Sequence, residues 1–103
     1  MPKSELTINE MLERAGEASG FLKALSNKNR LLILCNLLQD ELSVGALNEK
    51  VPLSQSALSQ HLAILRRDQL VATRRDSQTI YYSIADARVR ELIRTLHELF
   101  CAD

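Results

Sequence analysis

The sequence predicts a mainly α-helical fold with a small β-hairpin, in the order of four helices, two strands and a last helix. Two observations lead to this prediction. Apolar residues recur at three- and four-residue spacings over most of the chain, which is the period of an amphipathic helix. After Arg67 the pattern changes to alternation, in two short runs rich in β-branched and aromatic residues.

The length and composition indicate one globular domain spanning residues 1–103. The chain carries equal numbers of basic and acidic residues, so any basic surface must be local. Its longest strongly apolar run, Leu31 to Cys35, is far shorter than the roughly 20 residues of a membrane-spanning helix. The segment Met1 to Glu10 is polar and unlike a signal peptide, so we expect a cytoplasmic protein.

The first two helices are predicted over Thr7 to Leu25 and Lys28 to Leu38. The first has a single apolar stripe, made of Ile8, Met11, Leu12, Ala15, Ala18 and Leu22. The second is apolar nearly all round, and we therefore expect it to be central and buried.

Two short segments, Leu42 to Leu47 and Leu53 to Leu58, then share one pattern. In each, a serine (Ser43 or Ser54) follows the first leucine and can cap a helix N-terminus. The leucine before the serine can pack on the leucine five residues later, which is the hydrophobic staple. Two short helices with a tight connection are the elements of a helix-turn-helix.

The predicted strands are Leu70 to Arg74 and Thr79 to Ile84, joined by a turn at Arg75 to Gln78 that lacks the usual glycine. Asp86 can cap a last helix that reaches Phe100. The apolar stripe of this helix consists of Val89, Leu92, Ile93, Leu96, Leu99 and Phe100. These elements complete a winged helix-turn-helix.

The helix from Ser54 to Arg67 has the strongest functional signal. Its predicted core side consists of Leu58, His61, Leu62 and Leu65. Its other side consists of Gln55, Ser56, Ser59, Gln60 and Ala63. Short polar and amide side chains suit base edges in the major groove and phosphates. The alternative is an ordinary solvated helix face.

Arginines gather near the end of this helix and in the hairpin: Arg66, Arg67, Arg74 and Arg75. They predict phosphate contacts, which would make binding salt-dependent. The alternative is salt bridges with Asp68 and Asp76, which would contribute little to stability.

The stretch Leu53 to Leu62, followed by Leu65 to Asp68 and Leu70-Val71, resembles the recognition helix and first wing strand of the ArsR/SmtB repressors. The resemblance extends over about Phe21 to Cys101. It implies a homodimer paired through the first and last helices and bound to double-stranded operator DNA. The predicted DNA-contacting residues are Gln55, Ser56, Ser59, Gln60, His61, Arg66, Arg74, Arg75 and Gln78. One departure is Gln69, where the family commonly has glycine.

The same resemblance argues against a metal inducer. The Leu42 to Leu47 stretch has no thiol of the kind that arsenic and cadmium sensors place there. Zinc and nickel sensors use Asp, His, His and Glu on the last helix. Here Asp86 is followed by Arg88, and Leu99 and Ala102 occupy the downstream ligand positions. We predict no metal site and no cofactor.

The two cysteines, Cys35 and Cys101, remain as candidate sensing residues. Their placement resembles the sulfide- and persulfide-responsive branch of the family, the BigR, SqrR and HlyU group, and is most like the HlyU type. The implied mechanism is attack of a thiolate on a persulfide or polysulfide, followed by a disulfide or a bridge of several sulfurs. The other interpretation is that Cys35 is an inert core thiol. His97, four residues before Cys101, is a candidate to favour its thiolate.

An enzyme is not expected, because the sequence offers no Gly-rich phosphate loop and no nucleophile–base–acid set. A derepressor, which blocks the site of another repressor, would use the same residues as a repressor. A protein-binding winged helix and an ArsR-type regulator with structural cysteines are the remaining alternatives.

Overall fold

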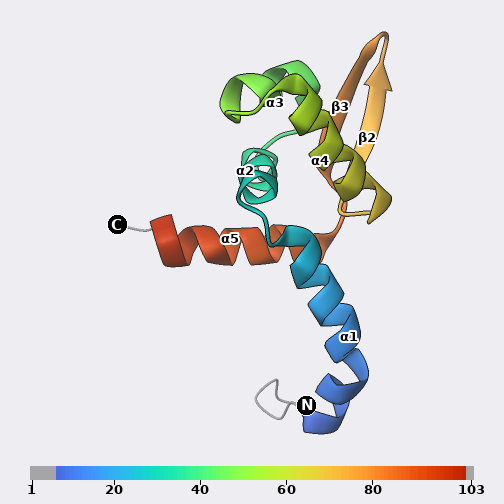
Figure 1. Cartoon of the computed structure of the whole chain (residues 1–103), viewed down its shortest axis with the longest axis vertical. Helices are drawn as coiled ribbons and strands as arrows, with labels where there is room; N and C mark the ends of the chain where they lie inside the picture. The colour runs from blue at the N-terminus through green and yellow to red at the C-terminus, as the bar shows by residue number, and fades with distance from the viewer. Residues whose placement is uncertain (1–6, 102–103) are drawn as a thin grey trace.

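The computed structural model describes residues 7–101 and contains five helices and three strands (Figure 1). In chain order the elements are α1 (Ile8–Leu25), α2 (Lys28–Asn36), β1 (Leu42–Ser43), α3 (Val44–Lys50), α4 (Gln55–Arg67), β2 (Val71–Asp76), β3 (Thr79–Ile84) and α5 (Ala87–Cys101). The predicted mainly helical fold with a hairpin wing is confirmed. Part of the Met1 to Glu10 segment lies outside the described residues.

The predicted serine caps begin α3 and α4. The hydroxyl of Ser43 accepts a hydrogen bond from the amide of Ala46, and that of Ser54 from the amide of Ala57, both at 3.1 Å. Each serine satisfies one of the amides that a helix N-terminus leaves without an intrahelical partner. The starting points of the two helices are therefore set by local sequence.

The sheet has three strands, one more than the sequence analysis predicts. Two residues, Leu42 and Ser43, pair with Tyr82 and Tyr81 of β3, so that the strand order is β1-β3-β2. The pairing follows from the cap, because Ser43 already has the extended backbone of an N-cap residue. A strand of two residues has no alternation to detect.

The hairpin of β2 and β3, which we call the wing, is paired from Val71 opposite Ile84 to Asp76 opposite Thr79. The prediction ended the first strand at Arg74, which is two residues too early. The turn consists of Ser77 and Gln78 alone, and Ser77 has a φ of 58° as a two-residue hairpin requires. Gln69, just after the end of α4, also has a left-handed backbone conformation, with a φ of 61°.

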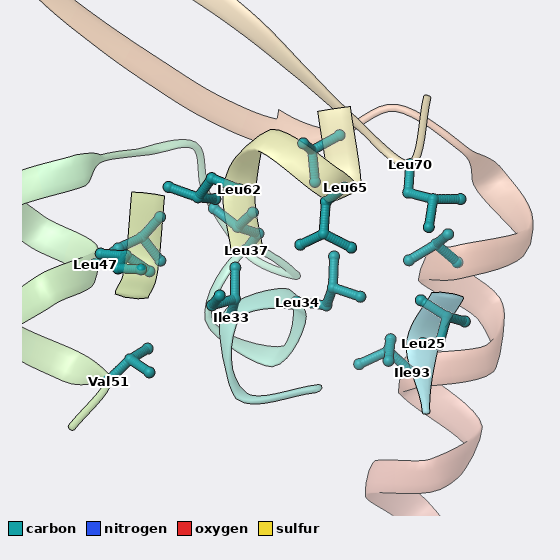
Figure 2. Packing of buried hydrophobic residues seen from close by; sticks show 13 residues of the cluster. Leu25, Ile33, Leu34, Leu37, Leu47, Val51, Leu62, Leu65, Leu70 and Ile93 are labelled. Carbon is teal, nitrogen blue, oxygen red and sulfur yellow. The ribbon is translucent and has the colours of Figure 1, made fainter. Parts of the chain in front are cut away.

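One apolar core holds these elements together (Figure 2). Its centre is α2, whose Ile33 and Leu34 are fully buried between α4 and α5. From α4, Leu62 and Leu65 enter the same core, three residues apart on one side of the helix. The opposite side of α4 is thereby fixed toward solvent.

The second helix is shorter and less enclosed than predicted. It ends at Asn36, with Leu37 as its C-cap, rather than at Leu38. Cys35 is exposed, so the expectation of a helix buried nearly all round is wrong on that side. The reason is that the neighbouring elements pack mainly on the side of Ile33, Leu34 and Leu37.

Helix α1 projects away from the remaining elements in Figure 1, and only its last residue, Leu25, is buried. Large apolar side chains are exposed on α1 and at the end of α5: Ile8 75%, Met11 53%, Leu12 70%, Leu22 53%, Leu99 70% and Phe100 81%. Over residues 7–101, no helix is both long and apolar enough to span a membrane.

Candidate nucleic-acid interface and cysteine pair

The exposed side of α4 presents the predicted polar side chains. Gln55, Ser56, Ser59 and Gln60 are all exposed. Leu58, Leu62 and Leu65 on the other side are buried in the core, which orients the helix. Hydrogen-bonding groups are thus held on a rigid scaffold, as the reading of base edges requires.

His61 lies at the boundary between the two sides and is half-buried. Its Nδ1 accepts a hydrogen bond from Nε of Arg30 at 3.2 Å, and Nη1 of Arg30 donates to the carbonyl of Ala24 at 3.1 Å. One guanidinium therefore links the end of α1, the start of α2 and the middle of α4. The role of Arg30 could not be predicted from the sequence, because its partner lies 31 residues away.

The wing arginines differ in their surroundings. Arg75 is exposed, as is Gln78 at the tip, and no salt bridge to Arg75 occurs among residues 7–101. Arg74 instead donates through Nε to both carboxylate oxygens of Glu41, at 3.0 and 3.2 Å. Its guanidinium carbon also lies 4.7 Å from the ring centre of Tyr81.

The ion pair of Arg74 and Glu41 is a further feature that the sequence analysis did not predict. The partners that the sequence suggests for the wing arginines are the aspartates Asp68 and Asp76, not a glutamate. The hydrogen bond from Arg74 holds the pKa of Glu41 below its ordinary value. Arg74 is thus neutralised locally in the free protein, whereas Arg75 is not.

The predicted group of four arginines is divided between two neighbourhoods. Arg66 is exposed and Arg67 pairs with Asp68 at 3.2 Å. Arg67 also lines a pocket with Lys23 of α1, whereas Arg74 lies beside Glu41 and Tyr81. Positive charge therefore flanks α4 both at its C-terminal end and in the wing.

The two cysteines meet at one apolar groove of about 270 Å³. Cys35 comes from α2 and Cys101 is the last residue of α5, which extends one residue further than predicted. Both thiols are free and both residues are exposed. The groove is lined by Leu31, Cys35, Ile93, Leu96, His97, Phe100 and Cys101.

The surroundings of the two thiols differ in a way that affects their chemistry. Burial against the groove raises the pKa of the Cys35 thiol, and the nearby Cys101 raises it further. His97 lines the same groove as Cys101, as its spacing on the helix predicted. The arrangement brings two thiols and an imidazole to one apolar surface, although they lie on two different helices.

The start of α5 is occupied by an ion-pair cluster. Asp86 accepts hydrogen bonds from Arg88, at 2.7 Å from Nη2, and Arg88 also reaches Glu17 of α1 at 3.5 Å. The hydrogen bond from Arg88 lowers the pKa of Asp86. No group of three or more metal-ligating side chains occurs within the described part of the chain. Ala102 lies outside the described residues.

Comparison with known proteins adds to this geometry. The family model described as "Bacterial regulatory protein, arsR family" matches residues 27–73, from the cap of α2 into β2. The transcriptional activator HlyU of Vibrio cholerae is 50% identical over 93% of this chain and 89% of its own length.

Two solved structures are also similar to this chain. Reduced HlyU from Vibrio cholerae has a TM-score of 0.85 and 51% identity, over 91% of this chain and 99% of that one. The transcriptional repressor BigR from Xylella fastidiosa has a TM-score of 0.88 and 38% identity, over 95% and 100% of the two chains. These proteins are regulators and not enzymes, as the sequence analysis predicts for this chain. The chain therefore belongs to the ArsR family of DNA-binding transcriptional regulators, in the part of the family that includes HlyU and BigR.

Proposed function

We propose that this protein is a cytoplasmic, homodimeric repressor whose affinity for operator DNA is controlled by the Cys35 and Cys101 dithiol. The observation that carries the proposal is the shared groove, in which two free, exposed thiols from different helices line one apolar surface. A covalent link there would join α2, the centre of the core, to the end of α5.

The exposed apolar residues support dimerisation through α1 and α5. Leu12 is 70% exposed and Phe100 is 81% exposed, and both belong to the predicted stripes. Large apolar side chains exposed at helical spacings along one side of a helix are a mark of an interaction site in a small protein. A second copy of the chain would cover it symmetrically and would place two α4 helices on one duplex.

The DNA-contacting residues follow from what remains accessible. The major groove would be contacted by the exposed side chains of α4, which are Gln55, Ser56, Ser59 and Gln60. The DNA backbone would be contacted by Arg66, Arg75 and Gln78. Arg74 would act after exchanging Glu41 for a phosphate. His61 would contribute through its exposed edge, because its Nδ1 is engaged by Arg30.

The proposed chemistry begins with a thiolate attacking the outer sulfur of an organic persulfide. A Cys–S–SH group forms, the S–S bond of the reagent breaks and an organic thiol leaves. The second cysteine then attacks the cysteine-bound sulfur and expels hydrosulfide, leaving a disulfide. Two persulfidated cysteines would react in the same way to give a bridge of three sulfurs. The dithiol is oxidised by two electrons and the reagent is reduced.

Cys101 is the proposed first nucleophile. The thiolate is the reactive form, and the raised pKa of Cys35 reduces its thiolate fraction at neutral pH. Cys101 is exposed at the C-terminal end of α5, so a reagent can reach it. Cys35 would then act as the resolving thiol.

The intact mass of the protein tests this chemistry. Reduced protein is treated separately with an organic persulfide and with peroxide, beside Cys35→Ser and Cys101→Ser controls. We expect a loss of two hydrogens, with or without whole sulfur atoms, that requires both cysteines and weakens operator binding. An unchanged mass under both treatments would make the cysteines structural and would refute the sensor.

A second experiment tests the assignment as a repressor. The operator is first selected from promoter DNA by the reduced protein, and transcription from it is then measured in a purified system. We expect the reduced protein to lower transcription and the oxidised protein to restore it. Activation that requires a second repressor on the same DNA would establish the derepressor instead.

A further inference from the structure

A charged pocket lies at the C-terminal end of α4, beside the side of the helix that carries the predicted DNA-contacting residues. Of its three cations, the sequence predicts a phosphate contact for Arg67 alone. The volume of the pocket is about 250 Å³ and its lining comes from three helices and the Asp68 cap. The lining residues are Gly20, Lys23, Ala24, Arg30, Ile64, Arg67 and Asp68. Three cations therefore face one carboxylate, in a protein without net charge.

Each cation of this pocket keeps hydrogen-bonding capacity. Lys23 is exposed and has no ion-pair partner within residues 7–101. The side chain of Arg67 is 71% exposed and uses only Nε on Asp68. Arg30 uses Nε on His61 and Nη1 on Ala24, and its Nη2 has no hydrogen-bond partner among the described residues.

The pocket is continuous with the exposed side of α4. Ser56, Gln60, Ala63 and Arg67 follow one another at helical spacings and are all exposed. Gln60 and Arg67 are seven residues apart, which is close to two turns and about 10 Å along the axis. The major groove is about 12 Å wide, so residues two turns beyond a base-reading side chain arrive at the bordering backbone.

We propose that this pocket binds a backbone phosphate of the operator at the border of each half-site, through Lys23 and Arg67, with Arg30 behind them. The proposal rests on the DNA-binding face described under the proposed function. It adds a contact from α1, the helix that carries the proposed dimer stripe. Because the contact is to phosphate, it positions the protein on the duplex and carries no sequence information.

The salt dependence of operator binding tests the proposal. Lys23→Gln and Arg67→Gln, singly and together, are compared with wild type and with Arg94→Gln, which removes one exposed charge from α5. Each phosphate contact contributes about 0.9 to the slope of log K against log salt. We expect the double variant to lower this slope by about 1.8 per dimer, which corresponds to one phosphate contact in each subunit. Its discrimination between operator and mutated operator should not change. The Arg94→Gln variant should keep the wild-type slope.

Neutral methylphosphonates at single positions of the operator identify the phosphate. We expect a methylphosphonate at one position beside each half-site to weaken operator binding by the wild-type protein. The same methylphosphonate should leave the operator affinity of the double variant unchanged. The phosphate-binding proposal would be overturned if every methylphosphonate lowered the operator affinity of the two proteins equally, or if the double variant kept the wild-type salt slope. Operator binding by the wild-type protein would uphold the proposed function in either case. Binding of inorganic phosphate to the pocket without these DNA effects would also overturn it. Wild-type protein that binds no operator would refute both proposals.

Discussion

Arg30 and His61 lie 31 residues apart in the sequence and join α2 to α4 through a 3.2 Å hydrogen bond from Nε to Nδ1. Since Arg30 also donates to the carbonyl of Ala24, the orientation of α4 is linked to the end of α1. Both helices have a proposed role, α4 in reading DNA and α1 in dimerisation. A shift of α1 would therefore alter the hydrogen bond that the Arg30 guanidinium makes to α4.

Replacing Arg30 by Lys should destabilise the fold and weaken operator binding. A lysine retains the charge but lacks the planar fork that serves two acceptors at once. Hydrogen bonds from charged donors contribute about 1.5–3 kcal/mol each, so we expect a loss of about 2 kcal/mol in the free energy of unfolding. Urea denaturation measures it, with the exposed Lys28→Gln as control. Equal stability of the two variants would show that the bridge is dispensable.

Replacing Glu41 by Gln should strengthen DNA binding. The substitution keeps the shape of the side chain but removes the charge that neutralises Arg74 in the free protein. A freed Arg74 can take a phosphate, which would steepen the salt slope by about 0.9 per subunit. Fluorescence anisotropy with labelled operator over a range of salt measures both effects. The exposed Glu49→Gln provides the same change of charge elsewhere, and an equal gain there would trace the effect to net charge.

Cys35 should be the slower of the two thiols, because burial raises the pKa of its thiol. In the Cys101→Ser variant the remaining Cys35 should react slowly with iodoacetamide at pH 7, and its rate should keep rising with pH. In the Cys35→Ser variant Cys101 should react faster at pH 7. The physical reason is that burial raises the pKa of Cys35 and so lowers its thiolate fraction. The rates are measured by stopping the alkylation at a series of times and determining the alkylated fraction by mass spectrometry. If Cys35 reacted faster than Cys101, the proposed roles of first nucleophile and resolving thiol would be reversed.

The parts of the fold that the sequence predicted are those specified locally. Ser43 and Ser54 begin helices through bonds to amides three residues on, and the spacing of Leu58, Leu62 and Leu65 orients α4. These signals lie within one or two helical turns, so a single sequence contains them.

The parts that were missed depend on contacts between distant segments. The pairing of β1 with β3, the Arg30–His61 bond and the Arg74–Glu41 ion pair join residues about 30 to 40 positions apart. The exposure of Cys35 was missed for a related reason. The sequence shows an apolar helix, but only the packing of its neighbours decides which side remains open.

A charge within the proposed dimer stripe should separate the subunits. Leu12 is 70% exposed in the single chain, so Leu12→Glu costs little in the monomer. In the proposed dimer the carboxylate would be buried without a partner, which is expensive. We expect sedimentation to show monomers, and operator affinity to fall by about 100-fold or more because the two half-sites are no longer bound together. Arg94→Gln makes the same change in net charge on the side of α5 away from its stripe, and it should remain dimeric. A Leu12→Glu protein that stays dimeric would place the interface elsewhere, whereas a monomer that binds operator at full affinity would show that dimerisation does not contribute to DNA recognition.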